Sequence, residues 1–197
     1  MTTEPTLRPR VEGAREAEIL RVTLETLAEV GYDRLTMDAV AQRAHASKAT
    51  LYRRWQCKQS LVIEALADLK EVTQLPDTGS LRDDLLAFYG CEGGLADPGV
   101  VATLASLVTA IAHDSEFASA FRKHVLDHKI VATKELYRRA IDRGEIRTDV
   151  DLDLAAPALP GIVLHRFFLF AELPDRAAIA RVLDELILPA LLTRKSS

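Results

Sequence analysis

The sequence predicts an all-α protein with a helix-turn-helix domain at residues 1–75 and a larger helical domain at residues 76–197. Apolar residues recur at the three- and four-residue spacing of amphipathic helices along most of the chain. No segment shows the alternation of apolar and polar residues that is typical of a half-buried strand. A cluster of helix breakers, residues 74–80, follows the fourth expected helix and precedes longer ones. These observations predict about nine helices in two domains.

Caps and breakers delimit four helices before that cluster. Thr36 and Ser47 are good N-caps, and Gly31 supplies a C-terminal stop for the first helix. Leu35 can pack on Val40 as a hydrophobic staple at the start of the second helix. The expected helices span residues 13–30, 37–44, 48–55 and 58–72.

Five further helices follow the breaker cluster. Ser80 and Ser115 are suitable caps for two of them, and Pro98 suits the first turn of another. Gly144 ends the longest. The expected helices span residues 80–91, 97–113, 116–143, 151–171 and 174–193.

The composition predicts a cytoplasmic protein with no membrane partner. The most apolar segment, residues 154–173, is interrupted by His165, Arg166 and two prolines, which disfavours a membrane span. The N-terminus has no apolar stretch like that of a secretory signal. Cys57 and Cys91 lack the spacing of a zinc site or a disulfide framework. We predict no catalytic residue, metal or cofactor.

Positive charge is concentrated in one short region of an acidic chain. The net charge is -4, yet residues 34–58 contain six basic side chains and one acidic side chain. Local basicity on an acidic background is expected of a face that binds phosphates. A merely solvated basic surface is the alternative.

Two short helices joined by a three-residue turn, the second of them basic, have the layout of a helix-turn-helix. Leu51 and Trp55 lie four residues apart on the inward side of the second helix, and we interpret Trp55 as a core residue. A helix of this kind fits the major groove of DNA, which is about 12 Å wide. The alternative is an ordinary three-helix bundle with basic exposed positions. The other faces hold Lys48, Thr50, Tyr52 and Arg53.

Residues 31–62, GYDRLTMDAVAQRAHASKATLYRRWQCKQSLV, resemble the N-terminal domain of the TetR family of bacterial transcriptional regulators. Residues 143–156 resemble, more loosely, the link between the long helix and the dimerising helices of many members. The resemblance implies a homodimeric regulator that binds a palindromic double-stranded DNA operator and is released by a small-molecule effector. A repressor is the favoured form. The matching residues are Gly31, Tyr32, Thr36, Ala41, Ser47, Lys48, Leu51, Tyr52, Trp55 and Lys58.

The resemblance also implies roles for individual residues. Ala49 stands where many members have glycine, and Cys57 stands where many have a serine or threonine cap. Arg8, Arg10 and Arg15 are candidates for a basic arm on DNA, and a solvated tail is the favoured state without DNA. The residues placed near base edges are Lys48, Ala49, Thr50 and Arg53. Those placed near phosphates are Thr36, Tyr52, Arg54 and Lys58.

The resemblance assigns effector binding and dimerisation to residues 76–197. Core packing is an equal alternative for each effector candidate, and His128 and His165 are the polar candidates that would orient a ligand. The effector candidates are Phe88, Tyr89, Leu104, Val108, Ile111, Phe121, Val125, His128, Tyr137 and His165. The candidates for the dimer interface are Ile162, Leu169, Ile179, Val182, Leu183, Leu186, Ile187 and Ala190.

Two other functions stay open at this point. One is a DNA-binding activator or architectural protein without a small ligand. The second is a metal-dependent enzyme or regulatory metal site, because His124 and His128 have the spacing of the zinc pair in H-E-x-x-H. Val125 replaces the general-base glutamate of that motif, which disfavours hydrolysis. A regulatory site would add Asp127 or Glu116.

Overall fold

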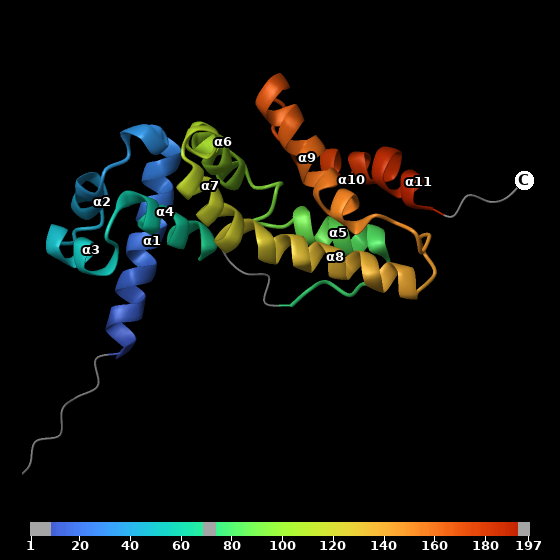
Figure 1. The fold of residues 1–197 in the computed structure, drawn as a ribbon, viewed down its shortest axis with the longest axis horizontal. Coiled ribbons are helices and arrows are strands. Elements are labelled where there is room, and N and C mark those ends of the chain that lie inside the picture. The colour runs from blue at the N-terminus through green and yellow to red at the C-terminus, as the bar shows by residue number, and fades with distance from the viewer. Residues whose placement is uncertain (1–8, 69–73, 193–197) are drawn as a thin grey trace, which may run out of the picture. The chain divides into compact units, whose positions relative to one another are not determined.

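The computed structural model describes residues 9–68 and 74–192, and these residues form helices and no strand (Figure 1). The prediction of an all-α fold is therefore confirmed. The first four helices are α1 (Pro9–Arg34), α2 (Met37–Arg43), α3 (Lys48–Arg54) and α4 (Lys58–Ala67). They are followed by α5 (Leu81–Tyr89), α6 (Pro98–His113), α7 (Ser115–Phe121), the π-helical segment η1 (Arg122–Leu126) and α8 (Asp127–Asp142). The last are α9 (Leu152–Phe170), α10 (Arg176–Val182), the π-helical segment η2 (Leu183–Ile187) and α11 (Leu188–Leu191).

The boundaries follow the capping residues closely. The Thr36 hydroxyl accepts a hydrogen bond from the Ala39 N–H at 3.1 Å, and the Ser47 hydroxyl accepts one from the Thr50 N–H, also at 3.1 Å. Gly31 breaks α1 as predicted, with φ 76° and ψ 164°, and a further helical turn follows it. A residue with a side chain is strained at that φ.

Several ends differ from the predicted ones: the long helix expected at residues 116–143 is divided into α7, η1 and α8, and Asp114 rather than Ser115 caps α7. The first helix begins at Pro9 rather than at residue 13, which fits the preference for proline in the first turn. α4 ends at Ala67 instead of near Val72, which lies outside the described residues.

The helices form two compact units. The first unit contains α1 to α4, the half of α6 that begins at Ser106, and α7. The second contains α5, α6 up to Ala105, and every element from η1 onward. Residues 106–121 therefore pack with the N-terminal helices although they follow the breaker cluster in sequence. Helical periodicity shows which face of a helix is buried and gives no sign of the helix that covers it. The domain boundary at residue 75 stays a prediction.

The core of the first unit fixes the outward face of α3. α1 packs against α4 and α2, and α2 packs against α3. The side chains of Leu27, Val40, Leu51, Trp55 and Leu61 are buried among these helices. Leu51 and Trp55 thus anchor the inner side of α3 in this core. The prediction that Trp55 is a core residue is confirmed.

The second unit packs around α8. α5 and α9 contact α8, while α10 contacts both α5 and α9. By length and composition α9 could cross a membrane; it contains Pro157 and Pro160, and it packs against α8 and α10 in this unit. The buried core includes Leu85, Leu136, Tyr137, Leu159, Ile179 and Leu183.

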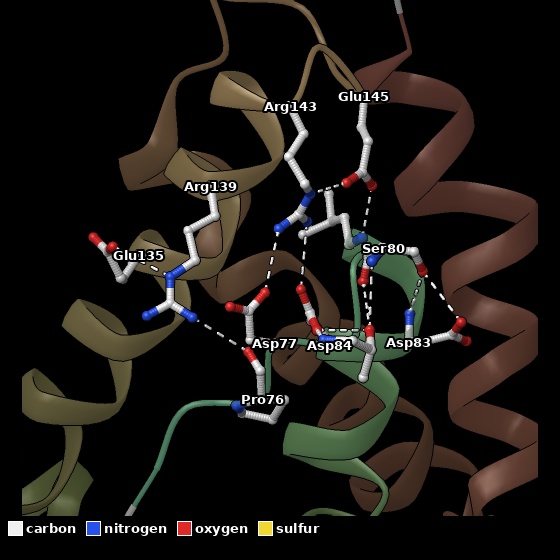
Figure 2. Close-up of polar contacts among 11 residues, drawn as sticks. Pro76, Asp77, Ser80, Asp83, Asp84, Glu135, Arg139, Arg143 and Glu145 are labelled. Carbon is white, nitrogen blue, oxygen red and sulfur yellow. Dashed lines mark hydrogen bonds and ion pairs between the residues drawn. The ribbon is translucent and has the colours of Figure 1, made fainter.

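A polar cluster fastens the start of the second unit (Figure 2). The Asp84 carboxylate is fully buried and accepts hydrogen bonds from the Thr78 N–H at 2.6 Å and the Thr78 hydroxyl at 2.7 Å. The Arg143 guanidinium approaches the second oxygen of Asp84 at 3.4 Å and also pairs with Glu145. Glu145 in turn accepts a hydrogen bond from the Leu81 N–H at 2.7 Å. These contacts join the breaker cluster, α5 and the end of α8.

Candidate nucleic-acid interface

The turn between α2 and α3 is anchored by α1. Arg15 donates hydrogen bonds from Nη2 to the carbonyl oxygens of Ala44 at 2.6 Å and His45 at 2.7 Å. The arm predicted for the three N-terminal arginines is therefore wrong for Arg15, which lies within α1 and holds the turn. Arg8 lies outside the described residues, and the Arg10 side chain is likewise not described. Sequence reasoning missed this role because the partners are about 30 residues away.

We expect His45→Gly to stabilise the protein by about 1 kcal/mol, because His45 has φ 51° and a left-handed conformation costs a side-chain-bearing residue roughly 1–2 kcal/mol. Part of the gain is offset by the larger backbone entropy of glycine in the unfolded chain. Urea denaturation measures the change. The matched control is Ala46→Gly, since Ala46 has no positive φ and should be destabilised. A loss of stability in His45→Gly would contradict the account.

The outward face of α3 carries the residues predicted to meet DNA. Lys48, Ala49 and Arg53 are exposed, and Thr50 is half-buried. The Tyr52 side chain is 50% exposed. All five belong to one seven-residue helix whose start, at Ser47, is capped. Thr36, placed near a phosphate by the family resemblance, is exposed and caps α2 with its hydroxyl.

The basic side chains of this face differ in their partners. Lys48 pairs with Asp38 at 2.5 Å, and this hydrogen bond raises the pKa of the lysine. Arg54 pairs with Glu64 at 2.6 Å and with Glu16 at 3.1 Å. Within the described part of the chain, Arg53 has no hydrogen-bond or ion-pair partner. Its guanidinium is therefore available to a ligand without first breaking a contact.

Lys58, another residue predicted to meet a phosphate, is the first residue of α4 and is held by Tyr32. The Lys58 ammonium donates to the Tyr32 carbonyl oxygen at 2.8 Å and lies 4.2 Å from the centroid of the Tyr32 ring. Cys57 is a poor cap, as expected, with its thiol 3.6 Å from the Ser60 hydroxyl oxygen. The Ser60 hydroxyl compensates: its oxygen lies 3.4 Å from the Cys57 N–H and it donates to the Cys57 carbonyl at 2.9 Å.

The candidates for the dimer interface divide into two groups. Ile179, Val182, Leu183 and Ile187 are buried in the core of the protomer, so their side chains are not free for a partner and we remove them from the proposed interface. Leu169, Leu186 and Ala190 are exposed, and Ile162 is half-buried. Periodicity indicated one wide apolar stripe and could not show which edge of it faces the core.

The effector candidates are also divided. Val108, Ile111 and Phe121 belong to the first unit, and the other seven belong to the second. His165 is exposed beside Phe170, with ring centroids 5.9 Å apart, so it does not lie among buried apolar neighbours as predicted. The Tyr89 hydroxyl is hydrogen-bonded to Thr133 at 2.7 Å. Sequence reasoning passed over Lys129, a half-buried lysine whose pKa is lowered by burial.

The histidine pair offers no metal centre. His124 is exposed in η1 and His128 is half-buried in α8. Among the residues that the structure describes, no three His, Cys, Asp or Glu side chains are grouped to hold a metal ion. A regulatory site built from Asp127 or Glu116 therefore has no support.

Two family profiles match this chain. Residues 19–65 match the family described as "Bacterial regulatory proteins, tetR family", and residues 75–186 match "Tetracyclin repressor-like, C-terminal domain". The chain belongs to the TetR family. The resemblance inferred from residues 31–62 is thereby confirmed.

Relatives within the TetR family are similar over most of this chain. The DNA-binding transcriptional repressor TetR of Mycobacteroides abscessus is 38% identical over 176 residues, covering 88% of this chain and 92% of the relative. An uncharacterized HTH-type transcriptional regulator of Mycobacterium tuberculosis is 36% identical over 181 residues, covering 90% and 88%. The crystal structure of a TetR family transcription regulator gives a TM-score of 0.65 at 29% identity, covering 91% of this chain and 99% of that one.

Membership of the TetR family identifies the helix-turn-helix as a DNA-binding element and the chain as a transcriptional regulator. The family and the names of its relatives indicate a regulator rather than an enzyme.

Proposed function

We propose that the protein is a homodimeric transcriptional repressor that binds a palindromic DNA operator through α3 and is released by a small-molecule effector. The observation that carries this proposal is the outward face of α3, on which Lys48, Tyr52 and Arg53 are exposed while Leu51 and Trp55 are buried; Arg53 has no partner among the described residues. A guanidinium in this position can donate two hydrogen bonds to guanine O6 and N7 in the major groove.

The partners in the free protein suggest how binding proceeds. Arg53 needs no rearrangement, whereas Lys48 must leave Asp38 and Arg54 must leave Glu16 and Glu64 before either turns to DNA. Exposed ion pairs of this kind contribute little to stability, typically about 0.2–1 kcal/mol. DNA can therefore displace the acidic partners of both cations at a small cost, through a base edge at Lys48 and a phosphate at Arg54.

Repression and dimerisation are supported by the relatives and by α9. The relative from Mycobacteroides abscessus is named a repressor, and occupying an operator is the simplest way to repress. One helix-turn-helix makes few contacts, so members of this structural class bind two half-sites as twofold dimers. The exposed apolar side chains of α9 support a dimer surface there. A protein that binds the chromosome acts in the cytoplasm.

The effector arm of the proposal follows from linkage. An effector releases the operator only if it binds the DNA-free state more tightly, and operator and effector then oppose each other by the same factor. Titrating each ligand found by thermal shift against the protein–operator complex tests this arm. A ligand that binds tightly and leaves operator affinity unchanged is not the effector.

We expect Arg53→Ala to relax sequence preference at one base pair per half-site, at a cost of about 1–3 kcal/mol at that position. The reason is that the bidentate contact to guanine disappears while the phosphate contacts remain. Fluorescence anisotropy against operator duplexes varied at each position measures the change. Arg21→Ala, which removes an exposed arginine from α1, is the matched control and should leave base preference intact. An unchanged preference in Arg53→Ala would show that this side chain does not read bases.

Selection of bound fragments from the source genome tests the function as a whole. The purified protein should enrich fragments that share a palindromic sequence, and the positions of these fragments relative to promoters separate a repressor from an activator. Failure to enrich any palindrome in repeated selections would refute the proposed function.

A further inference from the structure

Lys58 is held by a single residue in two ways. Its ammonium donates to the Tyr32 carbonyl oxygen at 2.8 Å and lies above the Tyr32 ring, 4.2 Å from the centroid. An ammonium has three donors, so two remain for an outside acceptor. A free lysine has many rotamers, and binding a phosphate would have to order them. The two contacts with Tyr32 order the side chain before DNA arrives.

The Tyr32 ring packs against the Phe117 ring, and Phe117 in turn stacks on Phe121; we call these three residues the aromatic column. The rings of Tyr32 and Phe117 have centroids 4.8 Å apart, and those of Phe117 and Phe121 are 6.4 Å apart with an interplanar angle of 14°. All three side chains are buried. Asp114 caps the helix that carries Phe117 by accepting the Phe117 N–H at 2.9 Å.

Phe117 reaches this place from a distant part of the sequence. α7 contacts α4 within the first unit, although it follows the breaker cluster and lies in the C-terminal part of the chain. The half-buried Lys58, at the start of the helix that follows α3, is thus supported through Tyr32 by the segment that follows α6.

We propose that Tyr32 and Phe117 are positioning residues for DNA binding, which hold the Lys58 ammonium where it meets a backbone phosphate. This inference rests on the proposed function, because it requires the chain to bind DNA. Tyr32 and Phe117 are buried and do not contact DNA themselves; they contribute to DNA binding by fixing the position of the Lys58 ammonium.

The Tyr32 hydroxyl takes no part in positioning Lys58, so its removal tests the ring alone. It is buried and has no hydrogen-bond partner among the described residues. Tyr32→Phe therefore removes no hydrogen bond. It keeps the ring and the backbone carbonyl, so both contacts with the Lys58 ammonium persist. Burial raises the pKa of Tyr32 to about 12, so the ring stays neutral at physiological pH in the wild type as well.

The salt dependence of DNA binding tests the inference, because each phosphate contact contributes about 0.9 to the slope of log Kobs against log salt. The probes are a random-sequence duplex and the enriched operator fragment. Lys58→Ala should lower the slope by about 0.9. Tyr32→Leu and Phe117→Leu should lower it by part of this amount and weaken binding, because the carbonyl of residue 32 still accepts from Lys58 while the ring contact is lost or loosened, and Tyr32→Phe should keep the wild-type slope. Adding Lys58→Ala to Tyr32→Leu should give the slope of Lys58→Ala alone.

Phe121→Leu is the matched control. It truncates an equally buried aromatic of the same helix that is not in ring contact with Tyr32, so it should cost stability without lowering the slope. Circular dichroism shows whether each variant is folded. If Tyr32→Leu does not fold, the slope of Phe117→Leu serves as the test.

Three results would overturn the inference. The first is a wild-type slope in both Tyr32→Leu and Phe117→Leu, and the second is a slope that Phe121→Leu lowers equally. The third is an additive loss in the double variant. If the wild type binds neither duplex, the proposed function fails together with this inference. Wild-type binding with unaltered slopes in the variants refutes this inference alone.

Discussion

Leu169→Glu should convert the dimer into monomers and weaken operator binding about hundredfold or more. The Leu169 side chain is 68% exposed near the end of α9, where other large apolar side chains are also exposed. Exposed apolar side chains that gather in one region mark an interaction site. An unpaired charge buried in an interface costs at least about 3 kcal/mol, which corresponds to about two orders of magnitude in affinity. The other large apolar side chains exposed on α9 or just after it are Leu154, Phe168, Phe170 and Leu173.

Sedimentation velocity measures the oligomeric state of this variant, and anisotropy measures its operator affinity. Val131→Glu is the matched control, because Val131 is 62% exposed on α8 and lies outside the proposed interface. It should remain a dimer with wild-type affinity. Dissociation of Val131→Glu with an intact Leu169→Glu dimer would move the interface from α9 to α8.

Asp84→Ala should lower the free energy of unfolding by about 3 kcal/mol. The substitution leaves the Thr78 N–H without its acceptor and removes the carboxylate that faces Arg143 inside the polar cluster of Figure 2. Hydrogen bonds to a buried charged group are worth more than neutral ones, and the stranded partners add their desolvation cost. Urea denaturation followed by circular dichroism measures the loss.

The neighbouring Asp83 provides the control for this change. Asp83 is exposed and contacts Ser80 and Arg82, so Asp83→Ala should change stability by less than about 1 kcal/mol. If both variants lose the same free energy of unfolding, the buried contacts of Asp84 contribute no more to stability than an exposed carboxylate in the first turn of a helix.

The helix boundaries and the motif could be predicted because they depend on neighbours in the chain. Thr36, Ser47 and Asp151 each accept an N–H from a residue two or three positions later, so the sequence around them contains the whole interaction. The inward direction of Leu51 and Trp55 follows from a spacing of four residues in the same way. The two π-helical segments were not anticipated, and we know of no local residue pattern in them that would have indicated the wider turn.

Partners that are distant in sequence could not be predicted. The sequence places Arg15 with Arg8 and Arg10 as candidates for a basic arm, yet its acceptors lie in the turn between α2 and α3. Sequence spacing placed Ile179 and Leu186 on one apolar stripe, and only packing decided that the first is buried and the second exposed. Likewise, nothing near Phe117 in the sequence indicates that its ring meets Tyr32.

The helices, their caps and the basic face of α3 thus follow from the chain itself, because contacts three or four residues apart depend on residue type and backbone geometry alone. The partners of Lys58, Arg54 and Asp84 were decided by the tertiary structure. Those contacts exist only once the core has brought separate helices together. Burial of apolar surface drives that packing, and because it is non-directional, the sequence pattern does not show which helices will meet.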